Sequence, residues 1–236
     1  MKLAVFYHCR ISGGHSQSGL SVNTDHAKNT VREQMALLVS SGLYDASNEI
    51  YVGVNGDDAD LDFVAAHVPD GTKILHHRPP AESLLPTMNF MHEWAKAHPT
   101  WLVCFFHAKG ATHPGDALIA NWRRCLEHHV IERWDRCVAD LESGQFDAVG
   151  VHWMTREQFG PIINPEHGGT PHFGGVFWWA TAKYLAGLPA LPRTVTCKED
   201  FFWPEHFCGS GPTPPRVKDY HSGWPNLHAC LTSSQQ

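Results

Sequence analysis

The sequence lacks any apolar run long enough to cross a membrane. Its longest apolar segments have the length of a strand, whereas a membrane helix needs about 20 apolar residues. Near the amino terminus only residues 3–7 are apolar before His8 and Arg10, which is too short for the core of a signal peptide. We therefore expect a soluble, cytoplasmic protein with no membrane span, or one in the host-cell cytoplasm if its source is viral.

Positive charge is also scarce. The 236 residues contain 18 Lys and Arg against 24 Asp and Glu, which gives a formal net charge of −6. Because proteins that hold nucleic acid carry a basic face, a nucleic-acid partner is not expected. A hydrophobic content of 42% at this length is enough to bury one core. We therefore predict a single domain over residues 1–236.

Several metal-binding and nucleotide-binding motifs are missing. The seven Cys are odd in number and never spaced C-x-x-C, so we expect buried thiols, and neither a disulfide framework nor a Cys zinc site. The 18 His form no H-E-x-x-H or other compact metal spacing. The P-loop pattern G-x-x-x-x-G-K-[ST] and the dinucleotide pattern G-x-G-x-x-G are both absent. These absences exclude the two commonest nucleotide-binding folds.

What the sequence does contain is an alternation of strand and helix patterns. It predicts strands over 3–8, 49–54, 73–77, 101–107 and 146–153, and helices over 29–41, 61–67, 84–95 and 119–141. The run over 101–107 is apolar on both faces and is expected to be central. A further strand over 176–180 and a helix over 181–186 precede a Pro-rich C-terminal segment, expected to cover the fold as ordered loops. The pattern predicts an α/β fold with a mostly parallel central sheet flanked by helices.

Ligands of open α/β sheets bind beyond the carboxyl ends of the strands. Loops rich in polar and small residues follow the first strand and the central strand. They supply the candidates for binding a nucleotide or a diphosphate: His8, Arg10, Gly13, Gly14, His107, Lys109 and Gly110. Lys109 can neutralise a diphosphate as a point charge, and the alternative is a solvated loop lysine.

The segment HFGGVFWW, residues 172–179, combines paired glycines with aromatic side chains. Glycines allow a ligand to approach the backbone closely, and aromatic faces pack on sugar rings or bases. The candidates for binding a sugar or acceptor are His172, Gly174, Gly175 and Trp178. The alternative is a buried strand, which alternation requires for two of the three aromatics at 177–179.

Two acidic segments are candidates for catalysis or for metal binding. Glu199 and Asp200 precede the apolar run 201–203. A carboxylate beside apolar side chains has a raised pKa and can serve as a general base. The alternative is that the two residues are the acidic N-terminus of a helix. Asp57, Asp58 and Asp60 resemble an oxygen-rich loop for Mg²⁺ or Mn²⁺. For this run the preferred interpretation is an N-cap with first-turn acids for the helix over 61–67.

In chain order the motifs are an N-terminal YH strand, SGLYD before a strand, HAKG after the central strand, WR opening a long helix, FDAVGVHW and HFGGVFWW. This set resembles small GT-A-type glycosyltransferase-like proteins of algae, bacteria and large viruses, whose common form is YxHTKG, WR and HFSGNFWWA. The resemblance covers about residues 1–205. It implies a GT-A-like domain with a nucleotide-sugar-binding half over 1–153, and an acceptor half with the C-terminal tail over 154–236.

The chain departs from the family pattern at two places. Val176 replaces the Asn of GNFWW, and His107-Ala108-Lys109 stands where GT-A enzymes carry a D-x-D metal motif. By resemblance, Gly174-Gly175 match the glycine-rich acceptor loop and Glu199-Asp200 match the x-E-D base motif. His221 or His228 matches the late His that joins the metal. Metal dependence stays open: Lys109 replaces part of the cation's role, or Asp57, Asp58, Asp60 and His221 hold Mn²⁺ or Mg²⁺.

The resemblance implies a glycosyltransferase that moves a sugar from a nucleotide diphosphate sugar, such as a UDP-sugar, to a glycan or a small hydroxyl acceptor. Such a hexosyltransferase-like enzyme acts in polysaccharide or glycan biosynthesis. Asp200 or Glu199 would take the acceptor proton, and direct displacement would invert the anomeric carbon. Two alternatives are a sugar- or nucleotide-binding module without catalysis and a metal-dependent hydrolase.

Overall fold

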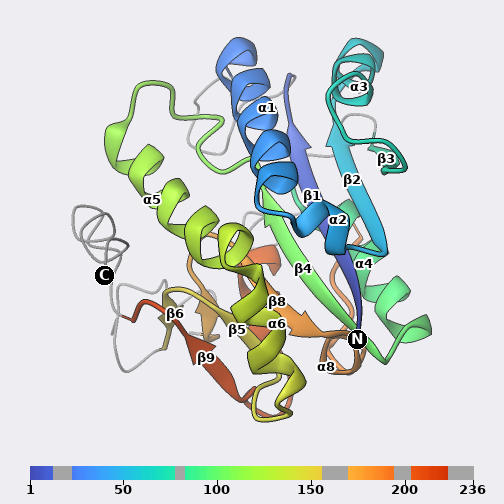
Figure 1. The fold of residues 1–236 in the computed structure, drawn as a ribbon, viewed down its shortest axis with the longest axis vertical. Coiled ribbons are helices and arrows are strands. Elements are labelled where there is room, and N and C mark those ends of the chain that lie inside the picture. The colour runs from blue at the N-terminus through green and yellow to red at the C-terminus, as the bar shows by residue number, and fades with distance from the viewer. Residues whose placement is uncertain (13–22, 78–82, 156–169, 194–202, 223–236) are drawn as a thin grey trace.

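The computed structural model describes residues 1–12, 23–77, 83–155, 170–193 and 203–222. Within them a seven-stranded sheet has the order β3-β2-β1-β4-β8-β5-β9 (Figure 1). Its strands, in chain order, are β1 Lys2–Arg10, β2 Glu49–Asn55, β3 Lys73–His77, β4 Trp101–His107, β5 Ala148–Gly150, β8 Trp178–Thr181 and β9 Val217–Asp219. In this sheet β8 runs antiparallel to both its neighbours, and the other strands are parallel. A separate antiparallel pair joins β6 Trp153–Met154 to β7 His172–Phe173.

Helices cover both faces of the sheet, as the sequence predicts (Figure 1). They are α1 Thr24–Ser40, α2 Leu43–Ala46, α3 Asp58–Ala65, α4 Leu85–Ala97, α5 Ala117–Glu127, α6 Trp134–Glu142 and α8 Ala182–Ala186. The side chains of β1 alternate between two cores, with Leu3 and Val5 in one and Ala4 and Phe6 in the other. The first core packs against α1, α5 and α6, and the second against α4 and α8. The predicted α/β class is therefore confirmed.

Most of the predicted elements are present, and β4 is central and buried over 102–106. α1 begins five residues before the predicted start because the Asn23 side chain accepts a hydrogen bond from the His26 backbone N–H at 2.9 Å and caps the helix there. α3 likewise begins at Asp58, three residues early, because Asp57 and Asp60 form a capping box. The preferred interpretation of that acidic run as a helix N-terminus is confirmed.

The prediction of one long helix over 119–141 is wrong. It is divided into α5, a π-helical segment η1 (His128–Glu132) and α6. The Arg133 backbone N–H bonds to the His128 carbonyl at 3.1 Å, five residues back, and Arg133 itself leaves the helical region at φ −105° and ψ 34°. The apolar stripe stays continuous across the interruption, because Leu126, Val130 and Leu141 are all buried.

The predicted strand over 146–153 is also shorter than expected. β5 stops at Gly150, and His152, at φ 58°, turns the chain into the separate pair of β6 and β7. β8 starts at Trp178 and not at Val176, because Gly175 and Val176 have φ of 89° and 58° and form a turn. The sequence did not predict β9, which lies in the segment expected to form only loops.

Five of the seven cysteines lie in the described residues, at positions 9, 104, 125, 137 and 208, and all five are buried free thiols, as expected. In the same part of the chain, no helix combines the length and the apolar character that crossing a membrane requires.

Candidate functional site

The carboxyl ends of β1, β2, β3 and β4 meet at one edge of the sheet, where the sequence places its nucleotide-binding candidates. The strand registers set His8 beside His107, Arg10 beside Asn55, and Asn55 beside His77. The Ala108 backbone N–H also bonds to the His8 carbonyl at 2.9 Å, which extends the pairing of β1 and β4 into the following loop. The structure thus brings these segments together at the predicted edge.

His8 and His77 share one hydroxyl group. The His8 Nδ1 atom lies 2.7 Å and the His77 Nε2 atom 3.1 Å from the Oγ1 atom of Thr87, on α4. Burial lowers the pKa of His8 well below its ordinary value, and burial with the nearby His76 lowers the pKa of His77 to about 4. Both imidazoles are therefore neutral at pH 7. They can direct hydrogen bonds toward a ligand but cannot neutralise a diphosphate.

The loop after the central strand, residues 107–110 (the HAKG loop), is bonded to the glycine pair. The His107 Nε2 atom lies 3.0 Å from the Gly175 carbonyl oxygen, so Nε2 carries the proton and donates it. Burial, and then the charge of Lys109, lower the pKa of His107 to about 3. The two segments therefore lie together, and His107, being neutral, contributes no positive charge at this edge of the sheet.

Lys109 is not a solvated loop lysine. Its Nζ atom lies 4.0 Å from the centroid of the Trp122 ring on α5, within the range of a cation–π contact, and the side chain is partly buried. Burial lowers the pKa of Lys109, while the negative charge of Glu205 opposes the shift. The ammonium group is held at a defined position beside the carboxyl end of β4.

Lys109 lines a small cavity, here called the cation cavity, between the start of α1, the HAKG loop and the start of α5. Its volume is about 240 Å³, and its basic and imidazole side chains are His26, Lys109, His113 and Arg123. The lining also contains Asp116, whose carboxylate caps α5 by accepting from the backbone N–H of Leu118 and Ile119. Ligand pockets usually have ~300–1,000 Å³. At about 240 Å³ the cation cavity has room for only a part of a ligand, and its Arg123 is paired with Glu33.

The sequence did not predict the buried polar side chains that lie next to the HAKG loop. Gln34, on α1, donates to the His107 carbonyl at 3.2 Å and to the Glu127 carboxylate at 2.8 Å. Burial raises the pKa of Glu127 to about 6, although Arg123, 3.5 Å away, lowers it. In the described residues, the Tyr7 hydroxyl and the Gln34 Oε1 atom are buried without a hydrogen-bond partner. The available signal was Gln34, a long polar side chain on the face of α1 that also carries Val31, Met35 and Leu38.

The glycine pair is explained by packing within the protein. A Cβ atom on Gly174 would lie 2.6 Å from Cε of Met154, and one on Gly175 would lie 2.7 Å from Cδ1 of Leu126. Gly175 also has φ 89°, a conformation that side chains disfavour. Val176 follows at φ 58°, an unusual conformation for a β-branched residue. These contacts leave no need for a ligand to explain the glycines.

The sugar-binding candidates at 172–178 point into the protein. Trp178 is 1% exposed and stacks on Phe105 with ring centroids 5.4 Å apart. His172 is 5% exposed, and its ring lies 4.7 Å from that of His206. All three aromatics over 177–179 are buried, not only the two that alternation requires, because both faces of β8 are covered. Trp178 therefore presents no ring face to a sugar, and its expected role is not supported.

The four predicted metal ligands are not brought together. Asp57 and Asp60 bond to each other's backbone N–H in the capping box, and Asp58 follows them on α3. His221 lies beyond β9, with its ring 5.2 Å from that of His152. Five strand spacings of about 4.8 Å, or about 24 Å across the sheet, separate β2, which precedes the three aspartates, from β9, which precedes His221. Within the described part of the chain, no three His, Cys, Asp or Glu side chains are placed to hold a metal ion.

Four of the predicted site residues, Gly13, Gly14, Glu199 and Asp200, lie outside the described residues. So does His228, the second candidate for the late His. Their roles stay predictions.

A family model described as "Domain of unknown function (DUF8361)" matches residues 6–193. The chain belongs to the DUF8361 family. This DUF8361 region spans β1 to α8, so it includes the HAKG loop, the cation cavity and the glycine pair but not β9. No curated protein matches the chain.

Several solved structures are similar to this DUF8361 chain at low identity. HddC from Yersinia pseudotuberculosis is 12% identical, with 99% of this chain and 100% of that chain covered and a TM-score of 0.47. A putative nucleotide-diphospho-sugar transferase from Desulfovibrio desulfuricans G20 is 11% identical, with 100% and 96% covered and a TM-score of 0.43. Glucosyl-3-phosphoglycerate synthase from Mycobacterium tuberculosis, solved with Mn²⁺, UDP and phosphoglyceric acid, is 12% identical, with 100% and 75% covered and a TM-score of 0.41. The fold class itself rests on the strand order and directions described above.

Proposed function

We propose that the chain is a transferase that uses a nucleotide diphosphate sugar and passes the sugar to an acceptor hydroxyl. The observation that carries the proposal is the position of Lys109, fixed over Trp122 in the cation cavity at the carboxyl end of the central strand. The sequence resemblance to GT-A-type proteins supports the same reading. The cavity would hold the diphosphate, the part of the donor on which negative charge develops as the sugar leaves.

In this proposal the sugar–phosphate bond breaks as the acceptor oxygen attacks the anomeric carbon. The electron pair of that bond goes to the diphosphate, which Lys109 and Arg123 stabilise as cations. The acceptor proton passes to the carboxylate of Asp200 or Glu199, and the single displacement inverts the anomeric carbon. Arg10 and the neutral His8, at the carboxyl end of β1, would contact the nucleoside portion. We propose residues 1–153 as the donor half of the domain and residues 154–236 as the acceptor half.

The described residues do not fit a divalent cation, because no donor set of three is gathered among them. No step of the proposal therefore depends on Mn²⁺ or Mg²⁺, and Lys109 supplies positive charge where related enzymes carry a D-x-D motif. The dependence on metal is measured directly by including Mn²⁺ as one arm of the binding experiment.

The first test is binding. UDP-, GDP-, CDP- and dTDP-sugars are each added to the purified protein, with and without Mn²⁺, and thermal unfolding is followed. A donor at 100 times its Kd adds about 2.7 kcal/mol to the free energy of unfolding. For a domain of this size, that raises Tm by about 5 to 11 °C. If no sugar nucleotide raises Tm, and calorimetry detects no binding, the proposal is overturned.

The second test assigns the diphosphate to the cation cavity. Lys109→Met should weaken donor binding by at least about ten-fold, since a hydrogen bond to a charged group contributes ~1.5–3 kcal/mol. Lys96→Met is the matched control, because Lys96 is an exposed lysine on α4 that pairs with Glu93 and does not line the cavity. Equal donor affinity in the two variants would remove Lys109 from the site.

The third test separates catalysis from binding. Asp200→Asn combined with Glu199→Gln should abolish the release of free nucleotide diphosphate while donor binding persists. Full turnover by the double variant would refute the role given to these carboxylates.

A second candidate function is a sugar- or nucleotide-binding module without catalysis. It is favoured by the sequence His107-Ala108-Lys109 at the D-x-D position and by the lack of a gathered metal donor set among the described residues. Donor binding without release of nucleotide diphosphate, across a panel of acceptors, would support it over the transferase. The metal-dependent hydrolase needs a donor cluster that the described residues do not contain.

A further inference from the structure

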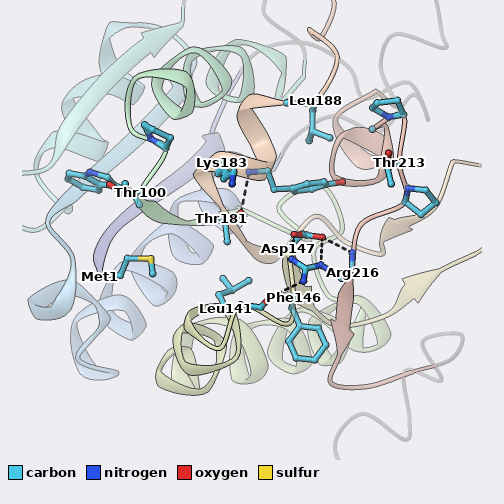
Figure 2. Close-up of a pocket in the computed structure, with 18 residues that line it drawn as sticks. Met1, Thr100, Leu141, Phe146, Asp147, Thr181, Lys183, Leu188, Thr213 and Arg216 are labelled. Atoms are coloured by element: carbon cyan, nitrogen blue, oxygen red, sulfur yellow. Dashed lines mark hydrogen bonds and ion pairs between the residues drawn. The ribbon is translucent and has the colours of Figure 1, made fainter.

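A larger cavity lies at the opposite edge of the sheet from the HAKG loop, and is here called the amino-edge cavity (Figure 2). Its volume is about 600 Å³, within the ~300–1,000 Å³ range of pockets for small molecules. The residues that line it include Thr100 just before β4, Asp147 just before β5 and Arg216 just before β9. Thr181, at the carboxyl end of β8, also reaches this edge because β8 runs antiparallel.

The walls of this cavity are largely apolar. Trp101, Leu141, Phe146 and Leu188 line it from four different elements and loops. Leu141 and Leu188 are 2% and 6% exposed, so these walls are anchored in the protein. Tyr184 also lines the cavity and is fixed by a hydrogen bond from its hydroxyl to the Cys208 carbonyl at 2.5 Å. A preformed apolar cavity of this kind binds the hydrocarbon or aromatic body of a ligand.

Asp147 and Arg216 form an ion pair in the middle of the lining residues, between Leu141 and Phe146 on one side and Lys183 and Leu188 on the other (Figure 2). The Arg216 guanidinium donates to both Asp147 carboxylate oxygens, at 2.7 and 3.1 Å, and its backbone N–H donates to one of them at 2.9 Å. Arg216 holds the pKa of Asp147 below its ordinary value, so the carboxylate is ionised and its charge is neutralised by its partner.

Two further positive charges lie in the lining, the amino group of Met1, which pairs with Glu142 at 2.9 Å, and Lys183. Lys183 belongs to the first turn of α8, is exposed and forms no ion pair within the described part of the chain. The lining therefore combines an apolar interior, two positive groups that are already paired and the unpaired ammonium group of Lys183.

We propose that the amino-edge cavity binds a small amphipathic anion, with its apolar body against Trp101, Leu141 and Leu188 and its carboxylate or phosphate group at Lys183. This proposal does not depend on the proposed transferase function, because the amino-edge cavity and the cation cavity lie at opposite ends of the strands. Its occupant is consequently neither the donor nor a part of it.

The proposal is tested by calorimetric titration of the full chain with three probes of equal chain length: decanoate, decyl phosphate and decanol. All are used below the concentrations at which they aggregate. Both anions should bind with one-to-one stoichiometry, and the neutral alcohol about five-fold more weakly, as expected for one exposed charge pair. A stronger response to decanoate or to decyl phosphate identifies the preferred head group.

Two variants locate the binding site. Lys183→Gln should reduce the affinity for the anions to that for decanol, and Lys96→Gln, on an exposed lysine outside the cavity, should leave it unchanged. Thr213→Trp, which adds a large side chain to an exposed position of the lining, should abolish binding of all three probes. The proposal is overturned if no probe binds saturably, if Thr213→Trp binds as the unmodified protein does, or if Lys183→Gln leaves the preference for anions intact.

Discussion

Glu127 is a buried carboxyl group whose ionisation should limit the stability of the protein at neutral pH. Its folded-state pKa is about 6, compared with an ordinary value of 4.5, and the principal cause is burial. A raised pKa means that the folded protein binds this proton more tightly than the unfolded chain does. The associated stability is fully present below about pH 4.5 and is lost as the pH rises through about 6. A shift of about 1.5 units at 1.36 kcal/mol per unit amounts to about 2 kcal/mol.

Glu127→Gln isolates this effect. The new side chain keeps an oxygen that can accept the hydrogen bond from Gln34, but it has no proton to lose in this range. The free energy of unfolding of the variant, minus that of the unmodified protein, should therefore increase by about 2 kcal/mol between pH 4.5 and pH 7.5. For a domain of this size the corresponding change in the Tm difference is about 4–8 °C.

The assay is urea unfolding followed by tryptophan fluorescence at half-unit pH steps. Asp62→Asn, on an exposed side chain of α3, controls for the loss of one carboxyl group. A difference in the free energy of unfolding that stays constant with pH would refute the reasoning, because the pKa of Glu127 would then be the same in the folded and unfolded states. A difference that decreases with pH would show that attraction to Arg123 outweighs burial.

Three further substitutions test the packing around the site. Gly53→Ala should lower the free energy of unfolding by about 1–3 kcal/mol, because the new Cβ atom would lie only 2.9 Å from the Cβ atom of Thr87. In urea unfolding, the double variant Gly53→Ala with Thr87→Ala should lose less stability than the sum of the losses of the two single variants. Asp57→Ala removes the cap of α3 and should cost about 1 kcal/mol by the same assay. Trp179→Phe removes the 2.8 Å hydrogen bond to the Val130 carbonyl and leaves that carbonyl buried without this partner. The free energy of unfolding should therefore fall by about 1–3 kcal/mol. Thermal unfolding measures the change, and an unchanged Tm would contradict the prediction.

The parts of the fold that the sequence predicted correctly are those with a strong periodic signal. The run at 101–107 is apolar up to Phe106, and β4 has the predicted bounds and lies at the centre of the sheet. The interruption of the long helix could not be predicted, because the stripe through Leu126, Val130 and Leu141 stays in phase across the π-helical segment. β9 has only three residues, too few to show an alternation.

The sequence predicted where the candidate site lies better than it predicted the chemical state of the residues there. The rule that ligands bind beyond the carboxyl ends of strands located His8, His107 and Lys109 correctly at one edge. Protonation was not visible in the sequence, because the charge of a histidine depends on how deeply its ring is buried. For Gly174 and Gly175, a packing requirement and a ligand requirement produce the same residue type, and only the neighbouring side chains distinguish them.

The antiparallel direction of β8 has a structural consequence. The turn that precedes it at Gly175 accepts the hydrogen bond from His107, and its far end at Thr181 lines the amino-edge cavity. Ladders to β4 and β5 hold the strand on both sides and fix its register with both neighbours. Its four residues span about 14 Å at ~3.4 Å per residue. The strand therefore connects the turn at Gly175 to the opposite edge through the interior of the sheet, without passing through any surface loop.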